Sequence, residues 1–324
     1  MGELTPADLV ALAEILAEDA DQLSDAFARE LADVLRRLER RLPEVISEAT
    51  SGRTGSAVRA AALGRARANL RRLLTEAGYD DLIDTSVTVS VDRALARLAA
   101  TSEAYRQALA FDTTGRPTAF TGLLRALVET GREDLRLWGD ELATALWRAT
   151  ARGVLGAEPP ARLIASLTSV LDGQRARAAT LYDTNVSIVQ RVAVQTIVPT
   201  LDATINDPTA PAPLATGGDV LPVPEDQLYA YVGPVDSLIR PFCLRHIGKV
   251  YTRAEIEALD NEQLPNPFLT GGGYNCRHLW APISRFSASA DLRGTDGRLP
   301  EVEAELARVR PQARTRTLRG RRTA

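Results

Sequence analysis

Ten apolar residues recur through residues 9–42 at steps of three, four and four, and this repeat constrains the fold more than any other feature. They are Leu9, Leu12, Leu16, Ala20, Leu23, Phe27, Leu31, Val34, Leu38 and Leu42. An 11-residue repeat of this kind keeps an apolar stripe on one face of a nearly straight α-helix. Thr5 and Pro6 suit a helix start, and Pro43 is expected to kink or end the helix. The stripe requires a partner, from this chain or from another copy.

Five further segments also have helical patterning, so this part of the chain is predicted to be mainly α-helical. Their expected bounds are Ser56–Ala77, Ser86–Ala110, Thr118–Gly153, Pro160–Leu171 and Arg175–Ile197. Gly78 and Pro199 are expected to terminate two of them. No nucleotide-binding glycine motif occurs here, so the role of this helical domain, placed at residues 1–205, is predicted to be architectural.

The composition changes after residue 205. Residues 206–225 contain Pro208, Pro211, Pro213, Pro222, Pro224 and a Gly-Gly pair, a pattern typical of an extended linker arm. Eight of the 16 aromatic residues, both cysteines and both histidines then lie between Tyr229 and Phe286. The expected fold is therefore mainly α, with a long-helix N-terminal region, a Pro-rich linker, a small α+β domain of short strands at 226–286, and a tail at 287–324.

Charge and hydropathy exclude several classes of protein. The net charge of −3 excludes a general nucleic-acid binder, although local basic segments remain compatible with DNA contact. No apolar run approaches the ~18 residues that a membrane helix needs, so no membrane association is expected. The N-terminus lacks a basic segment followed by an apolar one, and we expect assembly in a cytoplasm.

Short elements are predicted within the α+β domain. Strands are expected at Gln227–Val232, Lys249–Tyr251 and Tyr274–Trp280, and helices at Ile239–Arg245 and Ala254–Leu259. Thr252 and Glu255 have the spacing of a capping box at the start of the second helix. The three glycines at 271–273 are expected to form a flexible loop.

All the cysteine and histidine of the chain falls into two pairs, Cys243 with His246 and Cys276 with His278. Residues three apart on a helix, or two apart on a strand, can project to one side. The two pairs could therefore meet in a tetrahedral Cys2His2 zinc site that staples a domain of this size. Two other interpretations stay open: a Cys243–Cys276 disulfide, and ordinary packing of buried thiols and imidazoles.

Catalytic interpretations must use the same residues, and they find little support. A Cys–His nucleophile pair has no evident orienting partner, and no nucleophile-elbow motif for a Ser-His-Asp hydrolase is present. A metal-dependent nuclease would need more histidines or a dense carboxylate cluster beside them. The chain is therefore predicted not to be an enzyme.

Nine residues of the C-terminal domain carry a family resemblance. They are Asp236, Arg240, Cys243, Gly248, Lys249, Cys276, Arg277, His278 and Trp280. Their order and spacing resemble the C-terminal domain of phage minor head proteins, the family of phage Mu protein F and the SPP1-type head morphogenesis proteins. The resemblance covers about 50 residues, Gly233 to Pro282. The sequence departs from the family pattern in having a histidine at 246, and in having Gly-Tyr-Asn before Cys276 in place of His-Pro-Asn.

The resemblance implies a structural minor head protein of a tailed phage. Such a protein would lie at the portal vertex or in the capsid interior of the virion, contact portal and capsid proteins, associate as oligomers, and act in head assembly and in DNA packaging or exit. A metal-dependent nuclease or toxin-like effector delivered with phage DNA is one alternative function.

A DNA-binding module is the other alternative, because seven arginines and no acids follow Glu305. The predicted DNA contacts are Arg308, Arg310, Arg314, Arg316, Arg319, Arg321 and Arg322. A solvated tail without a ligand would have the same composition.

Overall fold

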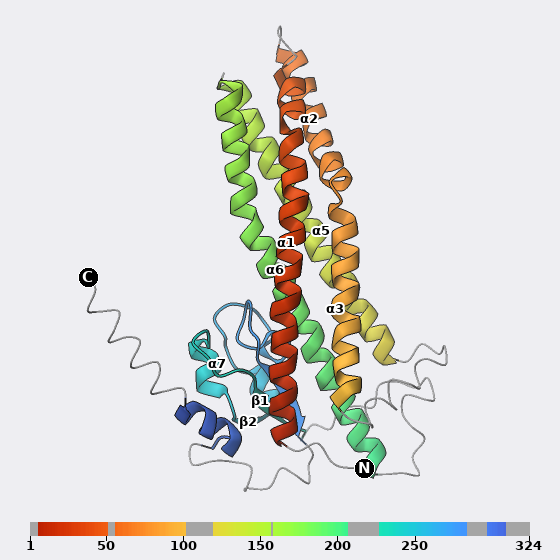
Figure 1. Ribbon diagram of the computed structural model, residues 1–324, viewed down its shortest axis with the longest axis vertical. Coiled ribbons are helices and arrows are strands. Elements are labelled where there is room, and N and C mark those ends of the chain that lie inside the picture. Colours follow the sequence, from red (N-terminus) through yellow and green to blue (C-terminus); the bar gives the residue numbers. More distant parts are fainter. Residues whose placement is uncertain are drawn as a thin grey trace, which may run out of the picture. The chain divides into compact units, whose positions relative to one another are not determined.

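The computed structural model describes residues 6–50, 56–101, 119–156, 158–206, 227–283 and 297–308. These residues are mostly helical and include a small antiparallel sheet near the C-terminal end, which confirms the predicted fold class (Figure 1). The chain divides into two compact units. Residues 22–89 and 128–183 form the helical unit, and residues 1–21, 90–127 and 184–324 form the mixed unit. None of the described helices is both long and apolar enough to cross a lipid bilayer.

Helix α1, Pro6–Thr50, buries all ten residues of the predicted stripe, from Leu9 to Leu42. The partner of the stripe is therefore supplied by this chain. The sequence left open whether Pro43 kinks the helix or ends it. The helix does not end there, since α1 continues to Thr50. Val45, Ile46 and Ala49 are buried beyond the proline, and this packing offsets the backbone hydrogen bond that proline cannot make.

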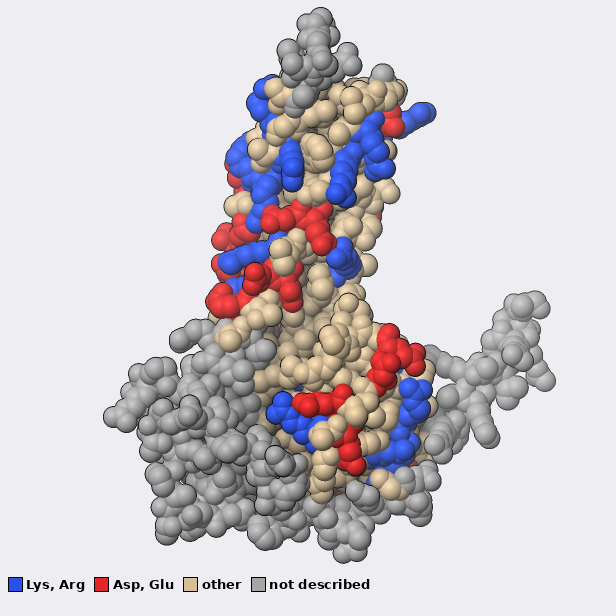
Figure 2. Space-filling view, turned by 180° about the vertical axis from the view of Figure 1, so that it is seen from behind, with Lys and Arg blue, Asp and Glu red and all other residues tan. Residues whose placement is uncertain are grey.

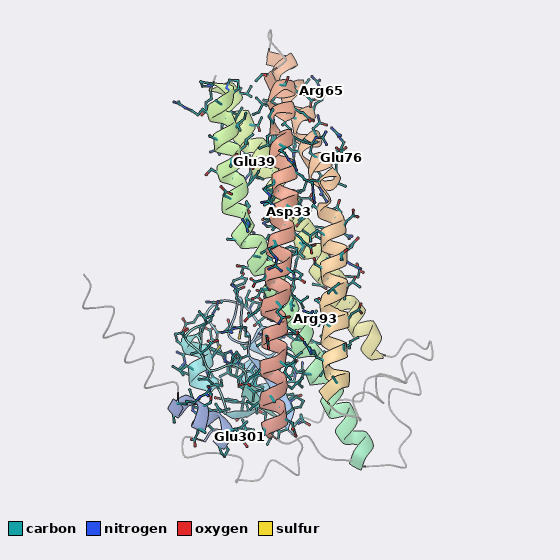
Figure 3. All side chains as sticks on the ribbon, in the orientation of Figure 1. Asp33, Glu39, Arg65, Glu76, Arg93 and Glu301 are labelled. Carbon is teal, nitrogen blue, oxygen red and sulfur yellow. The ribbon has the colours of Figure 1, made fainter. Side chains whose placement is uncertain are left out.

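The helical unit is a bundle of segments from α1, α2 (Ser56–Glu76), α3 (Tyr79–Thr101), α5 (Ala119–Leu155) and α6 (Pro160–Asn206) (Figure 1). The ring of Phe27 stacks on that of Tyr182 at 4.2 Å, and the Tyr79 hydroxyl donates to the carbonyl of Leu135 at 2.6 Å. Charged side chains such as Asp33 and Glu76 lie outside this core (Figure 3). Both signs of charge occur on the face that Figure 2 shows.

Helix α6 is a single helix, whereas the sequence pattern predicts two segments, separated after Leu171 and ended by Pro199. Gly173 interrupts nothing, because a glycine inside a long packed helix costs only about 1 kcal/mol. The backbone also continues past Pro199 to Asn206. Helix α3 begins at Tyr79, seven residues before the predicted start at Ser86, and Tyr79 is fully buried.

The sheet of the mixed unit has the order β2-β1-β3, and both pairings are antiparallel. Its strands are β1 (Leu228–Val232), β2 (Val250–Thr252) and β3 (Leu279–Ile283). Around it lie the short helices α7 (Pro241–His246), α8 (Arg253–Glu257) and α9 (Pro267–Thr270). Thr252 and Glu255 form the predicted capping box at the start of α8. The central strand β1 places Tyr231 opposite Trp280.

The third strand lies later in the chain than predicted. Sequence alternation suggested a strand at Tyr274–Trp280, but β3 begins at Leu279, so Cys276 and His278 precede it. Gly273 and Asn275 have φ angles of 97° and 53°. This left-handed backbone is incompatible with an extended strand, so the segment turns before it joins the sheet.

Residues 297–308 add to the α+β domain beyond its predicted end at 286, and residues 300–308 are helical. Leu299, Val302 and Leu306 are buried. The Arg298 guanidinium donates to the carbonyl oxygens of Ile247 and Leu244 at the end of α7. A cation is favourable there because the last carbonyls of a helix lack partners within the helix.

Candidate metal centre

Two buried sulfurs form the middle of the site. Cys243 lies in α7 and Cys276 in the turn before β3, and their side chains are 1% and 2% exposed. Their Sγ atoms are 3.7 Å apart, and both thiols are free. A disulfide needs about 2.05 Å between the sulfurs, so the pair is close without being bonded.

His278 completes a group of three. Its side chain is 3% exposed, and its Nδ1 lies 4.0 Å from the Cys276 Sγ. The ligand atoms of Cys243, Cys276 and His278 all lie within 4.8 Å of one another, so together they could hold a metal ion. Nε2 of the same ring is buried and has no hydrogen-bond partner among the described residues.

His246, the fourth ligand expected from sequence, is not part of this group. Its Nδ1 is 2.7 Å from the Tyr251 hydroxyl, and its ring packs against Phe242 with centroids 4.5 Å apart. Burial, and then the positive charges of Lys249, Arg245 and Arg298, lower its pKa to about 4. His246 is therefore close to Cys243 in sequence, but it does not belong to the group of candidate metal ligands.

The hydroxyl of Tyr231 in β1 contacts both sulfurs, although the sequence pattern did not indicate this residue. Its hydroxyl lies 3.4 Å from the Cys243 Sγ and 3.3 Å from the Cys276 Sγ. The ring stacks on the His278 imidazole at 5.4 Å and packs against Trp280 at 4.2 Å. The predicted strand was the one sequence feature that could have pointed to Tyr231, since alternate residues of a strand share a face. Nothing in the sequence indicated which face meets the cysteines.

Arg191 of α6 was also missed, although it holds in place the backbone that carries Cys276 and His278. Its guanidinium, 1% exposed, donates to the carbonyl oxygens of His278 at 2.7 Å and Leu269 at 3.1 Å, and to that of Cys276. One turn later, Gln195 donates to the Phe268 carbonyl at 2.9 Å. Arg191 and Gln195 lie four residues apart among the apolar residues of α6, and this spacing could have indicated a contact with another segment. Buried polar groups require hydrogen-bond partners.

The glycines at 271–273 wrap around the sulfurs, where the sequence suggested a flexible loop. The Gly272 amide donates to the Cys276 Sγ at 3.1 Å. A Cβ on Gly272 would collide with the Cys243 Sγ. Gly271 and Gly273 have φ angles of 58° and 97°, a region that favours glycine. Gly271 and Gly272 are therefore required by a close approach of backbone to sulfur, and Gly273 by its φ angle and the contact with Gln263.

The two thiols differ in their affinity for a proton. Burial raises the pKa of Cys276, but hydrogen bonding from Cys243 and the charge of Arg191 outweigh it, so the pKa lies well below its ordinary value. The hydrogen bond to Cys276, followed by burial, raises the pKa of Cys243. The arrangement favours a thiolate on Cys276 that accepts hydrogen bonds from its surroundings, which is the form that binds metals.

The other residues that carry the resemblance make contacts within the same domain. Arg277 makes an ion pair with Asp236 at 2.6 Å, and Arg240 donates to the Gly272 carbonyl at 3.3 Å. The Trp280 indole donates to the Pro267 carbonyl at 2.8 Å. The Lys249 carbonyl accepts from the Tyr231 amide at 3.0 Å.

Gly248 has a φ of 76°, and its amide donates to the Tyr231 carbonyl at 2.7 Å. A side chain at this position would also press on Val302. A glycine is thus needed both for the turn and for the packing of residues 297–308.

Of the predicted DNA contacts, only Arg308 lies among the described residues. Its side chain is exposed and pairs with Glu305 at 2.6 Å. Arg310, Arg314, Arg316, Arg319, Arg321 and Arg322 lie outside the described residues, as does the linker predicted at 206–225 apart from Asn206, which ends α6.

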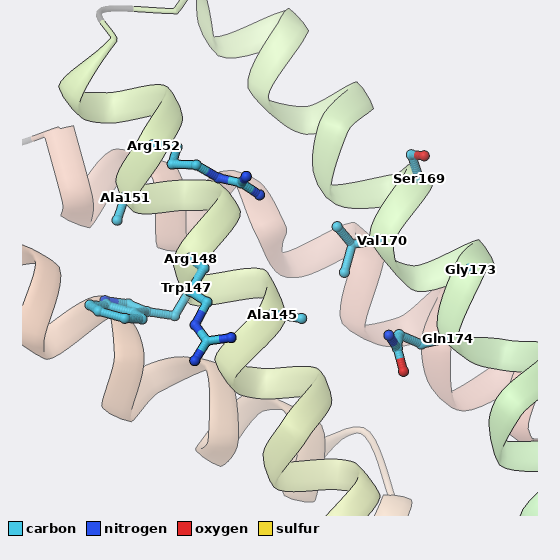
Figure 4. Close-up of a pocket in the computed structure, with 9 residues that line it drawn as sticks. All are labelled: Ala145, Trp147, Arg148, Ala151, Arg152, Ser169, Val170, Gly173 and Gln174. Carbon is cyan, nitrogen blue, oxygen red and sulfur yellow. The ribbon is translucent and has the colours of Figure 1, made fainter.

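A groove of about 680 Å³ lies between α5 and α6 in the helical unit (Figure 4). Its lining includes Arg148, Arg152, Ser169 and Gln174 but no cysteine, histidine or carboxylate. Trp147, also in the lining, donates to the carbonyl of Leu63 at 3.1 Å. The groove therefore lacks the groups that metal binding or acid–base chemistry needs, and the sulfur cluster is the stronger candidate site.

The chain matches no protein-family model, no curated protein and no solved structure. The contacts around Cys243, Cys276 and His278 are therefore the basis on which the function of this chain must be inferred.

Proposed function

We propose that this chain is a non-enzymatic structural minor head protein of a tailed phage. In this role it lies at the portal vertex or in the capsid interior and acts in head assembly and in DNA packaging or exit. The helical region supplies contacts to portal and capsid proteins and to other copies, and the α+β domain is an interaction module.

One observation carries the proposal: residues that resemble the minor head family touch one another although they come from distant parts of the domain. Asp236 pairs with Arg277 across 41 positions, and the Sγ atoms of Cys243 and Cys276 lie 3.7 Å apart across 33. A motif whose members support a single substructure is expected if they are kept together for a shared fold. These contacts support a resemblance of the domain as a whole over a coincidental match of isolated residues.

Two features of the domain fit an interaction module better than an enzyme. Cys243, Cys276 and His278 are each at most 3% exposed, so a macromolecular substrate has no access to them. Leu238, Leu244 and Tyr274 are exposed large apolar side chains of the same domain, and such side chains favour protein contacts where they adjoin.

Zinc is the metal that we propose for the three-residue group. Thiolates and imidazole suit zinc, and a buried cluster without open access suits a structural ion. Its role would be to hold α7 and the turn before β3 against the sheet. A domain with so small a core gains much of its stability from such a staple.

The test uses particles of the phage or prophage that encodes the chain. Its gene is disrupted and complemented with the wild type, with Asp236→Arg, or with the swapped pair Asp236→Arg/Arg277→Asp. Quantitative mass spectrometry counts copies per particle, and electron microscopy counts DNA-filled heads. We expect a few copies in each wild-type particle, loss of filled heads without the chain or with Asp236→Arg, and partial rescue by the swap.

Filled, infectious heads in normal number without the chain would overturn the proposal. Cleavage of nucleic acid by the purified chain, abolished in a folded His278→Ala variant, would instead establish the effector alternative.

A further inference from the structure

We propose that the phenolic oxygen of Tyr231 is the fourth ligand of a tetrahedral zinc ion bound by Cys243, Cys276 and His278. This inference rests on the zinc assignment made above and names the complete donor set of that site, two sulfurs, one nitrogen and one oxygen. It replaces His246, the fourth ligand that the sequence suggested.

The separations among the donor atoms match the edges of a zinc tetrahedron. With Zn–S bonds of about 2.3 Å and a Zn–O bond of about 2.0 Å, two sulfurs lie about 3.8 Å apart and a sulfur and an oxygen about 3.5 Å apart. The two Sγ atoms are 3.7 Å apart, and the Tyr231 hydroxyl is 3.4 and 3.3 Å from them. Three edges thus agree to about 0.2 Å.

The imidazole of His278 must move to complete the tetrahedron. A sulfur and a nitrogen bound to the same zinc lie about 3.6 Å apart, and Nδ1 of His278 is 4.0 Å from the Cys276 Sγ. That distance is too long for a strong hydrogen bond. The ligand atoms of Cys243, Cys276 and His278 lie within 4.8 Å of one another, so the imidazole would move toward the sulfurs by up to about 1 Å to reach the length of a Zn–N bond.

Tyr231 is fixed where a ligand is needed. Its backbone pairs on the inner strand of the sheet, through its amide to Lys249 and its carbonyl to Gly248. Its ring lies against the rings of His278 and Trp280. Among the described residues the hydroxyl contacts only the two sulfurs, which are weak hydrogen-bond partners. A buried phenol usually finds a stronger partner, and a metal ion would be one.

Charge balance favours the same donor set. Zinc binding requires both sulfurs as thiolates, so the proton that Cys243 carries is released to solvent. With two thiolates, a neutral imidazole and a neutral phenol, the zinc site has no net charge, which limits the cost of burying it. The Gly272 amide, 3.1 Å from the Cys276 Sγ, is placed to stabilise the thiolate.

The test compares zinc binding by the full chain and by two variants of one strand. Tyr231→Phe removes only the proposed donor atom. Tyr229→Phe is the matched control, because that ring packs edge-on against Phe268. Zinc is counted by elemental mass spectrometry, and affinity is measured by competition with a chromophoric chelator.

We expect one zinc per chain in the wild type and in Tyr229→Phe, and at least a tenfold loss of affinity in Tyr231→Phe, with circular dichroism unchanged. Substitution by Co²⁺ gives the visible bands of a tetrahedral ion, and these bands should shift in Tyr231→Phe alone. Wild-type affinity and an unchanged cobalt spectrum in Tyr231→Phe would overturn the assignment.

X-ray absorption at the zinc edge of the wild type tests the donor set without any variant. Two sulfurs, one imidazole and one oxygen are expected, whereas two imidazoles would return His246 to the site. Absence of zinc, or a Cys243–Cys276 disulfide found by mass spectrometry, would overturn the metal site itself. The minor head role is judged separately by the particle experiment, so the two failures are distinguishable.

Discussion

The Nε of Arg191 lies 2.7 Å from the carbonyl oxygen of His278, 87 positions later in the chain. The same guanidinium also serves the carbonyls of Leu269 and Cys276. One side chain of α6 therefore fixes the backbone that presents two of the proposed zinc ligands. Stability of the α+β domain and geometry of its metal site should depend on it together.

Replacing Arg191 by alanine should destabilise the mixed unit by about 3–5 kcal/mol, because three buried carbonyls would lose their donor. Urea unfolding followed by circular dichroism measures the change. Arg175→Ala is the control, since Arg175 is an exposed arginine of the same helix, and it should alter the free energy of unfolding by less than about 0.5 kcal/mol. Equal effects of the two substitutions would mean that the buried guanidinium does not anchor the loop.

Gly272→Ala should lower both stability and zinc content. The added Cβ would collide with the Cys243 Sγ, and relieving such overpacking costs about 1–3 kcal/mol. Gly173→Ala is the matched control, because a Cβ there has no neighbour within 4 Å and alanine is the better helix former by about 1 kcal/mol. The first variant should melt lower than the wild type and the second no lower. A Gly272→Ala protein with wild-type stability and full zinc would show that the loop does not enclose the sulfurs tightly.

Asp236 and Arg277 should be energetically coupled. Their ion pair is partly buried, with the arginine side chain 14% and the aspartate 38% exposed. A double-mutant cycle with Asp236→Ala and Arg277→Ala should give a coupling energy of about 1 kcal/mol. Additive single effects would contradict a direct interaction.

Because of His246, the free energy of unfolding should decrease as the pH falls below neutrality. Its folded pKa of about 4 lies under the ordinary value of 6.5, so the unfolded chain binds more protons between these values. The penalty is absent above about pH 6.5, grows as the pH falls, and is complete below about pH 4, reaching no more than about 2 kcal/mol for a half-buried ring.

The His246→Gln variant isolates this contribution, because other titrating groups cancel in the difference between the two proteins. The free energy of unfolding of the wild type should decrease relative to the variant from pH 7 to pH 4. A constant difference would show that burial and the charges of Lys249, Arg245 and Arg298 do not lower the pKa of the imidazole.

Removal of residues 309–324 should weaken binding to duplex DNA. Leu306 is buried in the mixed unit, so truncation after Arg308 keeps the packed residues and removes six arginines. The plot of log affinity against log salt should flatten by up to about 5, the value for six phosphate contacts. Filter binding at several salt concentrations measures the slope, and an unchanged slope would mean that the tail makes no phosphate contacts.

Local pattern predicted the helices well, and long-range geometry limited the rest. The stripe from Leu9 to Leu42 specifies α1 because its period is set by the helix itself. The capping box at Thr252 is equally local. Gly173 misled, because long-range packing overrides the weak local penalty of a glycine in a helix of this length. Pro199 misled as well, since the helix backbone runs on to Asn206.

At the candidate site, the sequence indicated Cys243, Cys276 and His278 as metal ligands, but it did not identify the fourth ligand that we propose. His246 was expected from its spacing to Cys243, a feature of one short helix. Tyr231 and Arg191 enter from a strand and a helix that lie 12 and 52 positions before Cys243. Which side chains such distant elements bring to the sulfurs depends on strand register and helix rotation, and neither is written in local spacing.

The order β2-β1-β3 has a consequence during protein synthesis. The central strand β1 is made first, yet one of its neighbours, β3, ends at Ile283, and the pairing of Gly248 with Leu299 comes later still. On the ribosome, β1 therefore waits with an open edge while Cys243 has emerged and Cys276 has not. Closure of the sheet around the three candidate ligands can only follow release of this whole segment, so the domain folds as one late event and its first thiol stays unburied until then.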